Sequence, residues 1–142
     1  MKVRDIMTRH VVRIGGEEPV EAAARALTHY NVGILPVCGP DGRLCGVVTD
    51  RDLVTRILSA GRSAADVKVK DVMTGRLVTV GPDTYASTAA GIMGREQIRR
   101  LPVVENGKLC GMVTLGDLAG TEEGNLDAAD ALVEITRNIC KK

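Results

Sequence analysis

Two short stretches of the chain hold the residues best suited to chemistry. Residues 46–52 read Gly-Val-Val-Thr-Asp-Arg-Asp, and residues 111–117 read Gly-Met-Val-Thr-Leu-Gly-Asp. Each is an apolar strand that runs into a polar corner where a helix is expected to begin. The carboxylate of Asp52 or Asp117 can accept hydrogen bonds from two neighbouring hydroxyl groups at once. Free backbone N–H groups at the start of a helix favour an anion such as phosphate. The two corners are therefore the candidate ligand-binding sites.

The same residues have a structural alternative. Thr49 and Asp52, like Thr114 and Asp117, stand three residues apart. This is the spacing of a capping box, in which a threonine at the N-cap and an acid at the third helical position satisfy each other's backbone N–H groups. A capping residue can also face a ligand, so the pattern leaves both roles open.

The corners belong to an internal repeat. Val-Arg-Asp-Ile-Met-Thr at 3–8 returns as Val-Lys-Asp-Val-Met-Thr at 69–74, and Leu-Pro-Val at 35–37 returns at 101–103. One residue is missing from the second hairpin turn, where a change of length is best tolerated. We expect repeat 1 at 1–62, a linker at 63–68, repeat 2 at 69–121 and a tail at 122–142.

Each repeat predicts the element order β-α-β-β-α, which makes the fold class α+β. Alternating apolar residues predict first strands at 11–14 and 77–80. Helices follow, one after Pro19 and one with Asp83 as its N-cap. Asp-Gly and Asn-Gly turns then predict hairpins. Their strands are 34–38 with 44–49 and 100–105 with 108–114, and the closing helices are 51–60 and 115–119.

The tail predicts one further helix, at residues 127–138. Helical spacing places a set of its residues on one face, which must pack on the repeats or on a second subunit. These residues are Leu132, Val133, Thr136, Ile139 and Cys140.

Composition excludes several classes of function. The chain of 142 residues has 19 basic and 18 acidic side chains and contains neither Phe nor Trp. We therefore expect no nucleic-acid partner, since the net charge is near zero, there is no basic tail and there are few rings for stacking. No apolar run reaches the roughly 20 residues that span a bilayer, so we expect a cytoplasmic protein without a membrane partner. No phosphate-binding loop, nucleophile elbow or zinc-protease motif is present, so we expect no enzyme.

The repeated motifs resemble a tandem pair of CBS (cystathionine-β-synthase) motifs, as in small stand-alone bacterial CBS-pair proteins. The resemblance rests on Asp-Ile/Val-Met-Thr, Leu-Pro-Val and Gly-x-Val-Thr-x-x-Asp-Leu, each present twice between residues 3 and about 120. It implies two repeats related by a pseudo-two-fold axis, with a ligand cleft on either side, and a homodimer. It also implies AMP, ADP, ATP or S-adenosylmethionine as a regulatory ligand, without a required cofactor.

The resemblance assigns roles to matching residues. Asp52 and Asp117 would hold ribose hydroxyls, and Thr49 and Thr114 would reach ribose or phosphate oxygens. Basic residues before Leu-Pro-Val would reach phosphate. The second repeat has Arg99 and Arg100 there, whereas the first has Gly33 and Ile34. Inside the loops, Arg51 is matched by the small Gly116. We therefore predict the better nucleotide site at Asp117, with one of the two arginines and Gly33 nearby.

The cysteines give a further hypothesis. Cys45 and Cys110 are repeat equivalents, for which buried, unreactive thiols are the favoured interpretation. Cys38 and Cys140 have no repeat equivalents, and a redox-sensitive disulfide between them would tie the tail to a strand. The four cysteines lack metal-ligand spacing, so no metal site is assigned.

Together these observations predict a regulatory sensor that binds an adenosine-containing ligand between its repeats and signals occupancy to a protein partner. The sequence does not identify that partner. Two alternatives remain: a structural or interaction protein with vestigial ligand sites, and a protein that responds to redox state or metal through its cysteines.

Overall fold

In the computed structural model, residues 1–140 are described, with side chains described for residues 1–137. The chain divides into two compact units. Unit 1 contains residues 1–11, 78–106 and the chain from 110 onward, and unit 2 contains residues 12–77 and 107–109. The units therefore cut across the sequence repeats. Each consists mainly of one repeat and also takes in the first residues of the other.

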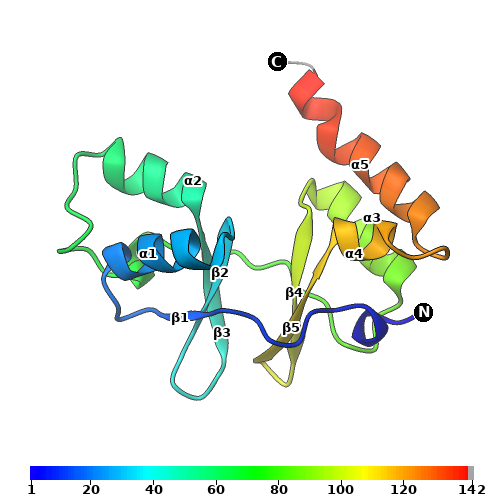
Figure 1. The fold of residues 1–142 in the computed structure, drawn as a ribbon, viewed down its shortest axis with the longest axis horizontal. Helices are drawn as coiled ribbons and strands as arrows, with labels where there is room; N and C mark the ends of the chain where they lie inside the picture. Colours follow the sequence, from blue (N-terminus) through cyan, green and yellow to red (C-terminus); the bar gives the residue numbers. More distant parts are fainter. Residues whose placement is uncertain (141–142) are drawn as a thin grey trace. The chain divides into compact units, whose positions relative to one another are not determined.

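Unit 2 is a small sheet with helices packed against it (Figure 1). The strand order is β1-β2-β3, with β1 parallel to β2 and β2 antiparallel to β3. The first and last residues of both predicted hairpin strands are confirmed. The helix after the hairpin, α2, is continued by a π-helix at Val54–Leu58. The elements are β1 Ile14–Gly15, α1 Val20–Tyr30, β2 Ile34–Cys38, β3 Leu44–Thr49 and α2 Asp50–Leu53.

The core of unit 2 is aliphatic, as the absence of Phe and Trp requires. One cluster joins the sheet to α1 and includes Leu35 and Val48, and a second lies around Ile57. Val69 and Val72, from the opening segment of the second repeat, are buried in these clusters. The segment is fixed by backbone hydrogen bonds between Thr74 and Val47. The first residues of repeat 2 are thus part of the core of unit 2.

Unit 1 has the equivalent arrangement with one extra helix. Its two-stranded sheet is β4-β5, and helix α5 packs along α3 and α4 (Figure 1). Val3, from the opening segment of the first repeat, is fully buried in its core. The elements are a 3-10 turn at Val3–Asp5, α3 Ala86–Glu96, β4 Arg100–Glu105, β5 Lys108–Thr114, α4 Leu115–Ala119 and α5 Asn125–Cys140.

The first strand of each repeat was predicted wrongly. Strand pairing in the first repeat covers only Ile14–Gly15 rather than 11–14. In the second repeat, 77–80 is not a strand, and Val80 makes a single bridge to Val103. Apolar alternation marks residues that face a core, but a strand also needs a neighbour for its backbone groups. The N-cap of α3 is Tyr85 rather than Asp83, whose carboxylate instead pairs with Arg4.

The tail helix is confirmed, but its buried face differs from the predicted one. Leu132 and Val133 are 41% and 58% exposed. The residues that face α3 and α4 are instead small or aliphatic, namely Ala128, Ala131 and Ile135. Helices approach closely where side chains are small, and a Cβ on Gly94 of α3 would lie 3.5 Å from the Cα of Ala131. Of the other predicted residues, Thr136 is half-buried. The side chains of Ile139 and Cys140 lie outside the described residues.

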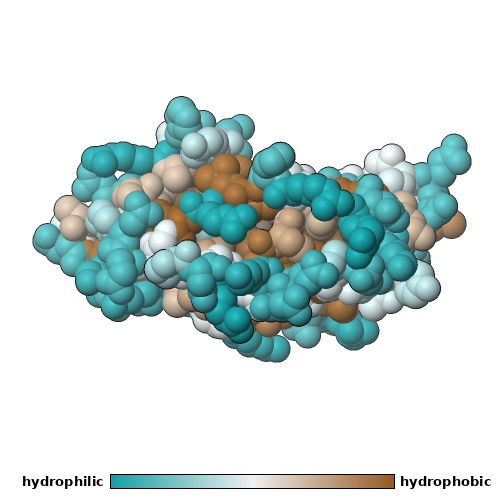
Figure 2. Space-filling model, turned by 90° about the horizontal axis from the view of Figure 1, so that it is seen from below, coloured by the Kyte–Doolittle hydropathy of each residue, from teal (hydrophilic) through white to brown (hydrophobic). Residues whose placement is uncertain are grey.

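The surface of the chain is mixed. On the face in Figure 2, hydrophilic residues cover most of the area and hydrophobic residues show between them. In the described part of the chain, no helix has the length and apolar character needed to cross a membrane.

An ion-pair cluster joins the start of α1 to the opening segment of repeat 2. The carboxylate of Glu17 lies 2.8 Å from the ammonium groups of both Lys68 and Lys70. The hydrogen bond from Lys68, followed by that from Lys70, lowers the pKa of Glu17 from 4.5 to about 2. Because the folded-state pKa is depressed, the stabilisation is complete above pH 4.5 and is lost as the pH falls towards 2.

Replacing Glu17 by Gln should therefore lower the melting temperature at neutral pH, and the difference from the native chain should vanish near pH 2. Glu122→Gln is the matched control, because Glu122 is exposed and has no ion pair among residues 1–137. Calorimetric melting across this pH range measures both. A Glu17→Gln difference that is the same at every pH would contradict the linkage.

Candidate functional site

Both predicted corners are reciprocal capping boxes. In the first, the backbone N–H of Asp52 donates to the Thr49 hydroxyl at 3.1 Å, and the Thr49 N–H donates to Oδ2 of Asp52 at 3.0 Å. In the second, the N–H of Asp117 donates to the Thr114 hydroxyl at 3.1 Å, and the Thr114 N–H donates to Oδ2 of Asp117 at 2.8 Å. The structural role is confirmed at both corners. The capping box engages Oδ2 of the aspartate at each corner, so Oδ1 is the oxygen that could contact other groups.

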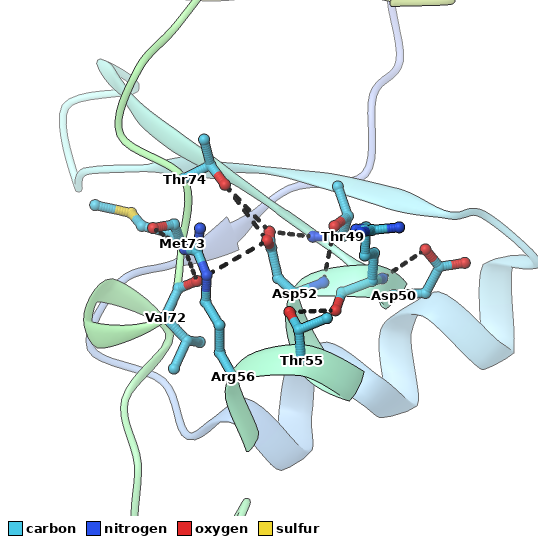
Figure 3. Close-up of polar contacts among 9 residues, drawn as sticks. Thr49, Asp50, Asp52, Thr55, Arg56, Val72, Met73 and Thr74 are labelled. Atoms are coloured by element: carbon cyan, nitrogen blue, oxygen red, sulfur yellow. Dashed lines mark hydrogen bonds and ion pairs between the residues drawn. The ribbon is translucent and has the colours of Figure 1, made fainter. Parts of the chain in front are cut away.

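At the first corner both carboxylate oxygens are engaged within unit 2 (Figure 3). Asp52 is only 7% exposed. The Thr74 hydroxyl lies 3.4 Å from both of its oxygens, and Nε of Arg56 lies 3.8 Å from Oδ1. Arg56 also donates from Nη1 to the carbonyl oxygens of Val72 at 2.7 Å and Met73 at 3.0 Å. Asp52 is thus the centre of a polar cluster that ties the helix after β3 to residues 72–74.

At the second corner the equivalent contacts are missing. Asp117 is half-exposed, and within residues 1–137 its Oδ1 has no hydrogen-bond partner. The repeat equivalent of Arg56 is Thr121, whose hydroxyl donates to the Leu118 carbonyl at 2.9 Å. The equivalent of Thr74 is Thr8, whose backbone pairs with Met112 but whose hydroxyl does not reach Asp117. The second corner therefore presents a free carboxylate oxygen, and the first does not.

Arg99 and Arg100 lie at the entrance to the second corner. The Leu115 N–H donates to the Arg99 carbonyl at 2.7 Å, which fixes the backbone before β4 beside the start of α4. Arg99 is exposed and Arg100 is half-buried, and neither has an ion pair in the described part of the chain. Gly116 is exposed, with only the Thr114 hydroxyl within 4 Å of where a Cβ would lie. The backbone of Arg99 and the exposed Gly116 therefore lie beside the Asp117 corner.

The companions of the first corner are less favourable for an anion. The Asp50 N–H donates to the Gly33 carbonyl at 3.1 Å, so Gly33 lies beside its own corner in unit 2. Its predicted place near Asp117 stays a prediction. Arg51 is exposed, but the carboxylate of Asp50 accepts its backbone N–H at 2.8 Å. The first corner therefore has the negative charge of Asp50 at the position that the apolar Leu115 occupies in the second corner.

The helix that begins at the second corner is too short to attract phosphate strongly by itself. α4 has five residues, whereas α2 has four and is continued by the π-helix at Val54–Leu58. A helix dipole is the sum of aligned peptide units, and the corner carboxylates already occupy these ends. Phosphate binding at the second corner would therefore depend on its arginines.

Sequence reasoning missed Arg56 and Thr74. A signal for Arg56 was present, since Arg56 stands four residues after Asp52, the spacing of an ion pair on a helix. The second repeat has Thr121 at that position. What the sequence did not indicate is that residues 72–74 lie against the first corner.

The cysteines differ from their predicted environments. Cys38 is buried, but Cys45 is exposed and Cys110 is half-buried, so the prediction that both repeat equivalents are buried is wrong for Cys45. The side chain of Cys140 lies outside the described residues, so its predicted pairing with Cys38 stays untested. Within the described residues, no group of three or more His, Cys, Asp or Glu side chains could hold a metal ion.

The CBS domain model matches residues 3–59 and 69–123. The chain belongs to the CBS domain family. A CBS domain-containing protein of Bacillus subtilis (strain 168), YhcV, is 37% identical over 134 residues, which are 94% of each chain. Hypoxic response protein 1 of Mycobacterium tuberculosis (strain ATCC 25618 / H37Rv) is 34% identical over 116 residues, covering 82% of this chain and 81% of the relative.

Solved structures place the CBS pair in the same fold. A crystal structure of hypoxic response protein I with two coordinated zinc ions has a TM-score of 0.77 at 34% identity, covering 84% of this chain and 97% of that one. The CBS pair of protein MJ0100, in complex with 5′-methylthioadenosine and S-adenosyl-L-methionine, has a TM-score of 0.74 at 24% identity, with the same coverage. CBS pairs are regulatory ligand-binding modules.

Proposed function

We propose that this CBS pair is a non-enzymatic sensor that binds an adenosine-containing ligand of the AMP, ADP or ATP class at the Asp117 corner. One observation carries the proposal. Asp117 is held rigidly by its capping box while its Oδ1 has no partner among residues 1–137 and is accessible to solvent. A carboxylate oxygen that is fixed in place, accessible and without a partner among residues 1–137 suits the neighbouring hydroxyl groups of a ribose.

The surrounding residues support the remaining parts of the ligand. Arg99 and Arg100 have no ion pair among residues 1–137, and a guanidinium group that turned towards the corner could bind phosphate through two hydrogen bonds. Gly116 leaves the corner open for close approach of the ligand to the backbone. The fold that the chain shares with MJ0100 accommodates ligands that contain adenosine, so S-adenosylmethionine is a further candidate.

Isothermal titration tests this function. AMP, ADP, ATP, S-adenosylmethionine and NAD are titrated separately into dialysed protein, which denaturing mass spectrometry has shown to be free of bound ligand. We expect saturable binding of at least one of the first four. Binding of none of the five compounds would reject the proposal.

For the first corner the contacts favour a structural role. Asp52 already satisfies Thr49, Thr74 and Arg56, so a ribose would have to displace existing partners. Occupancy of the second corner would be signalled to a partner protein only if ligand binds one arrangement of the chain better than another.

The proposal includes a homodimer. On the helix that follows α2, Val54 and Leu58 are exposed at 54% and 76%. Apolar side chains at this exposure, one turn apart on a helix, fit the same surface of a second copy. Sedimentation velocity distinguishes dimer from monomer, and Leu58→Glu should shift the chain to monomer. A native chain that sediments as a monomer at every concentration would contradict the dimer.

A further inference from the structure

The hairpin of β2 and β3 contains an irregularity next to two cysteines. Val37 pairs with Gly46, but Cys38 pairs with Leu44, so Cys45 is an extra residue without a partner on β2. An extra residue of this kind is a β-bulge, which bends the strand and redirects a side chain. If the register of residues 34–37 continued, Cys45 would pair directly with Cys38, and the two side chains would share one face of the hairpin. The bulge shifts this pairing to Leu44 and leaves Cys45 beside the partner of Cys38.

Cys38 and Cys45 line one surface pocket of about 530 Å³, together with Arg13 and Lys70. The sulfur of Cys45 lies 4.0 Å from where a Cβ on Gly39 would be, which places it beside the residue that follows Cys38. The Cα atoms of directly paired residues are about 4.5–5.5 Å apart, and those of disulfide-bonded cysteines are usually about 4.4–6.8 Å apart. Cys45, next to the partner of Cys38, is therefore within reach.

The two thiols differ in a way that suits sequential chemistry. Cys45 is exposed, and its one hydrogen bond among residues 1–137 is a long contact of 3.6 Å from its thiol to the Arg43 carbonyl. Cys38 is buried, and this burial raises its pKa, while the nearby Arg13 opposes the shift. An oxidant in solution therefore meets Cys45 first, and Cys38 is positioned as the second thiol.

The second repeat provides an internal comparison. Cys110 is the repeat equivalent of Cys45, but the equivalent of Cys38 is Val104. The Cys110 thiol is half-buried and donates to the Val103 carbonyl at 3.3 Å. Only the hairpin of the first repeat therefore has two thiols on facing strands in the described part of the chain.

We propose that Cys38 and Cys45 are a reversible disulfide site, with hydrogen peroxide as the oxidant. The Cys45 thiolate attacks the peroxide O–O bond, which gives a sulfenic acid and releases hydroxide. The Cys38 sulfur then attacks the sulfenic sulfur, forms the S–S bond and displaces water. Each sulfur is oxidised by one electron, the peroxide accepts both electrons, and the two thiol protons end in water.

Tryptic mapping of the full chain tests the site, because trypsin places every cysteine in a separate peptide. These peptides are 26–43 for Cys38, 44–51 for Cys45, 109–137 for Cys110 and 138–141 for Cys140. Dilute protein is treated with hydrogen peroxide and alkylated under denaturing conditions before digestion. We expect peptides 26–43 and 44–51 to be joined with loss of two hydrogens, and dithiothreitol to separate them.

Variants make the assignment specific. Cys45→Ser should abolish the joined peptide, whereas Cys110→Ser should leave its yield unchanged. Cys38→Ser should leave Cys45 as a sulfenic acid that a dimedone probe traps. A joined peptide that contains 138–141, a link between two copies of 44–51, or four alkylated thiols after peroxide treatment would each overturn the proposal.

Discussion

Replacing Asp52 with alanine is expected to lower the free energy of unfolding by about 2–3 kcal/mol, whereas the equivalent change at Asp117 should cost about 1 kcal/mol. Both variants lose the acceptor of a capping box. Only Asp52→Ala also removes the buried carboxylate that Thr74 and Arg56 contact. Urea unfolding followed by circular dichroism measures the two midpoints.

Two further variants separate charge from capping at this site. Asp52→Asn keeps an acceptor for the Thr49 N–H and removes only the charge that Arg56 meets. Its cost should therefore lie between those of the native chain and Asp52→Ala. Arg56→Met should lose the donors to Val72 and Met73 while keeping the aliphatic stem. Equal costs for Asp52→Ala and Asp117→Ala would show that the first corner is no more closed than the second.

Replacing Gly111 with alanine is expected to destabilise the chain by about 1–3 kcal/mol. A Cβ there would lie 2.7 Å from the sulfur of Met7 and 2.9 Å from the carbonyl oxygen of Thr8. Thr8 is bound to β5 by two backbone hydrogen bonds with Met112, so the segment cannot retreat without losing them. The change therefore tests directly whether residues 1–11 belong to unit 1.

Two glycines serve as comparisons. Gly46→Ala should behave like Gly111→Ala, because its Cβ would lie 2.8 Å from the sulfur of Met73 and from the carbonyl oxygen of Thr74. Gly91, inside α3, has nothing within 4 Å of its Cβ position, so Gly91→Ala should stabilise by about 0.4–1 kcal/mol. Midpoints of urea unfolding give all three. A neutral Gly111→Ala would mean that the opening segment does not pack there.

The repeat and its hairpins could be predicted because their signals are local. Asn106 and Gly107 both have positive φ, at 54° and 79°, as the turn between β4 and β5 requires. An Asn-Gly pair favours this backbone conformation whatever surrounds it. The predicted bounds of the strands on either side of the turn are accordingly confirmed. The capping boxes are local in the same sense, since donor and acceptor are three residues apart.

The opening segment of each repeat belongs to the unit formed mainly by the other repeat. This arrangement could not be predicted, because it depends on pairing between distant parts of the chain. Nothing in residues 69–74 shows that Thr74 pairs with Val47 and brings a hydroxyl to Asp52. The buried face of α5 was missed for a related reason. Hydrophobicity favoured Leu132 and Val133, but close packing on α3 selected the small residues Ala128 and Ala131.

The residue types of the candidate site were therefore predictable, but the difference between the Asp52 and Asp117 corners was predictable only in part. The arginines already distinguished the Asp117 corner in the sequence. The structure adds a separate reason, which is that the Asp52 carboxylate is occupied by Thr74 and Arg56 while one oxygen of Asp117 has no partner among residues 1–137.

Titration of Asp117→Asn and Asp52→Asn tests this asymmetry most directly, using AMP or whichever compound of the panel binds the native chain most tightly. Asparagine keeps an acceptor for each capping box, so both variants should fold. Loss of a charged hydrogen bond is worth about 1.5–3 kcal/mol, so Asp117→Asn should weaken binding by about tenfold or more. Asp52→Asn should leave the affinity nearly unchanged. Lost binding in Asp52→Asn, with native affinity in Asp117→Asn, would contradict the assignment of the ligand to the second corner.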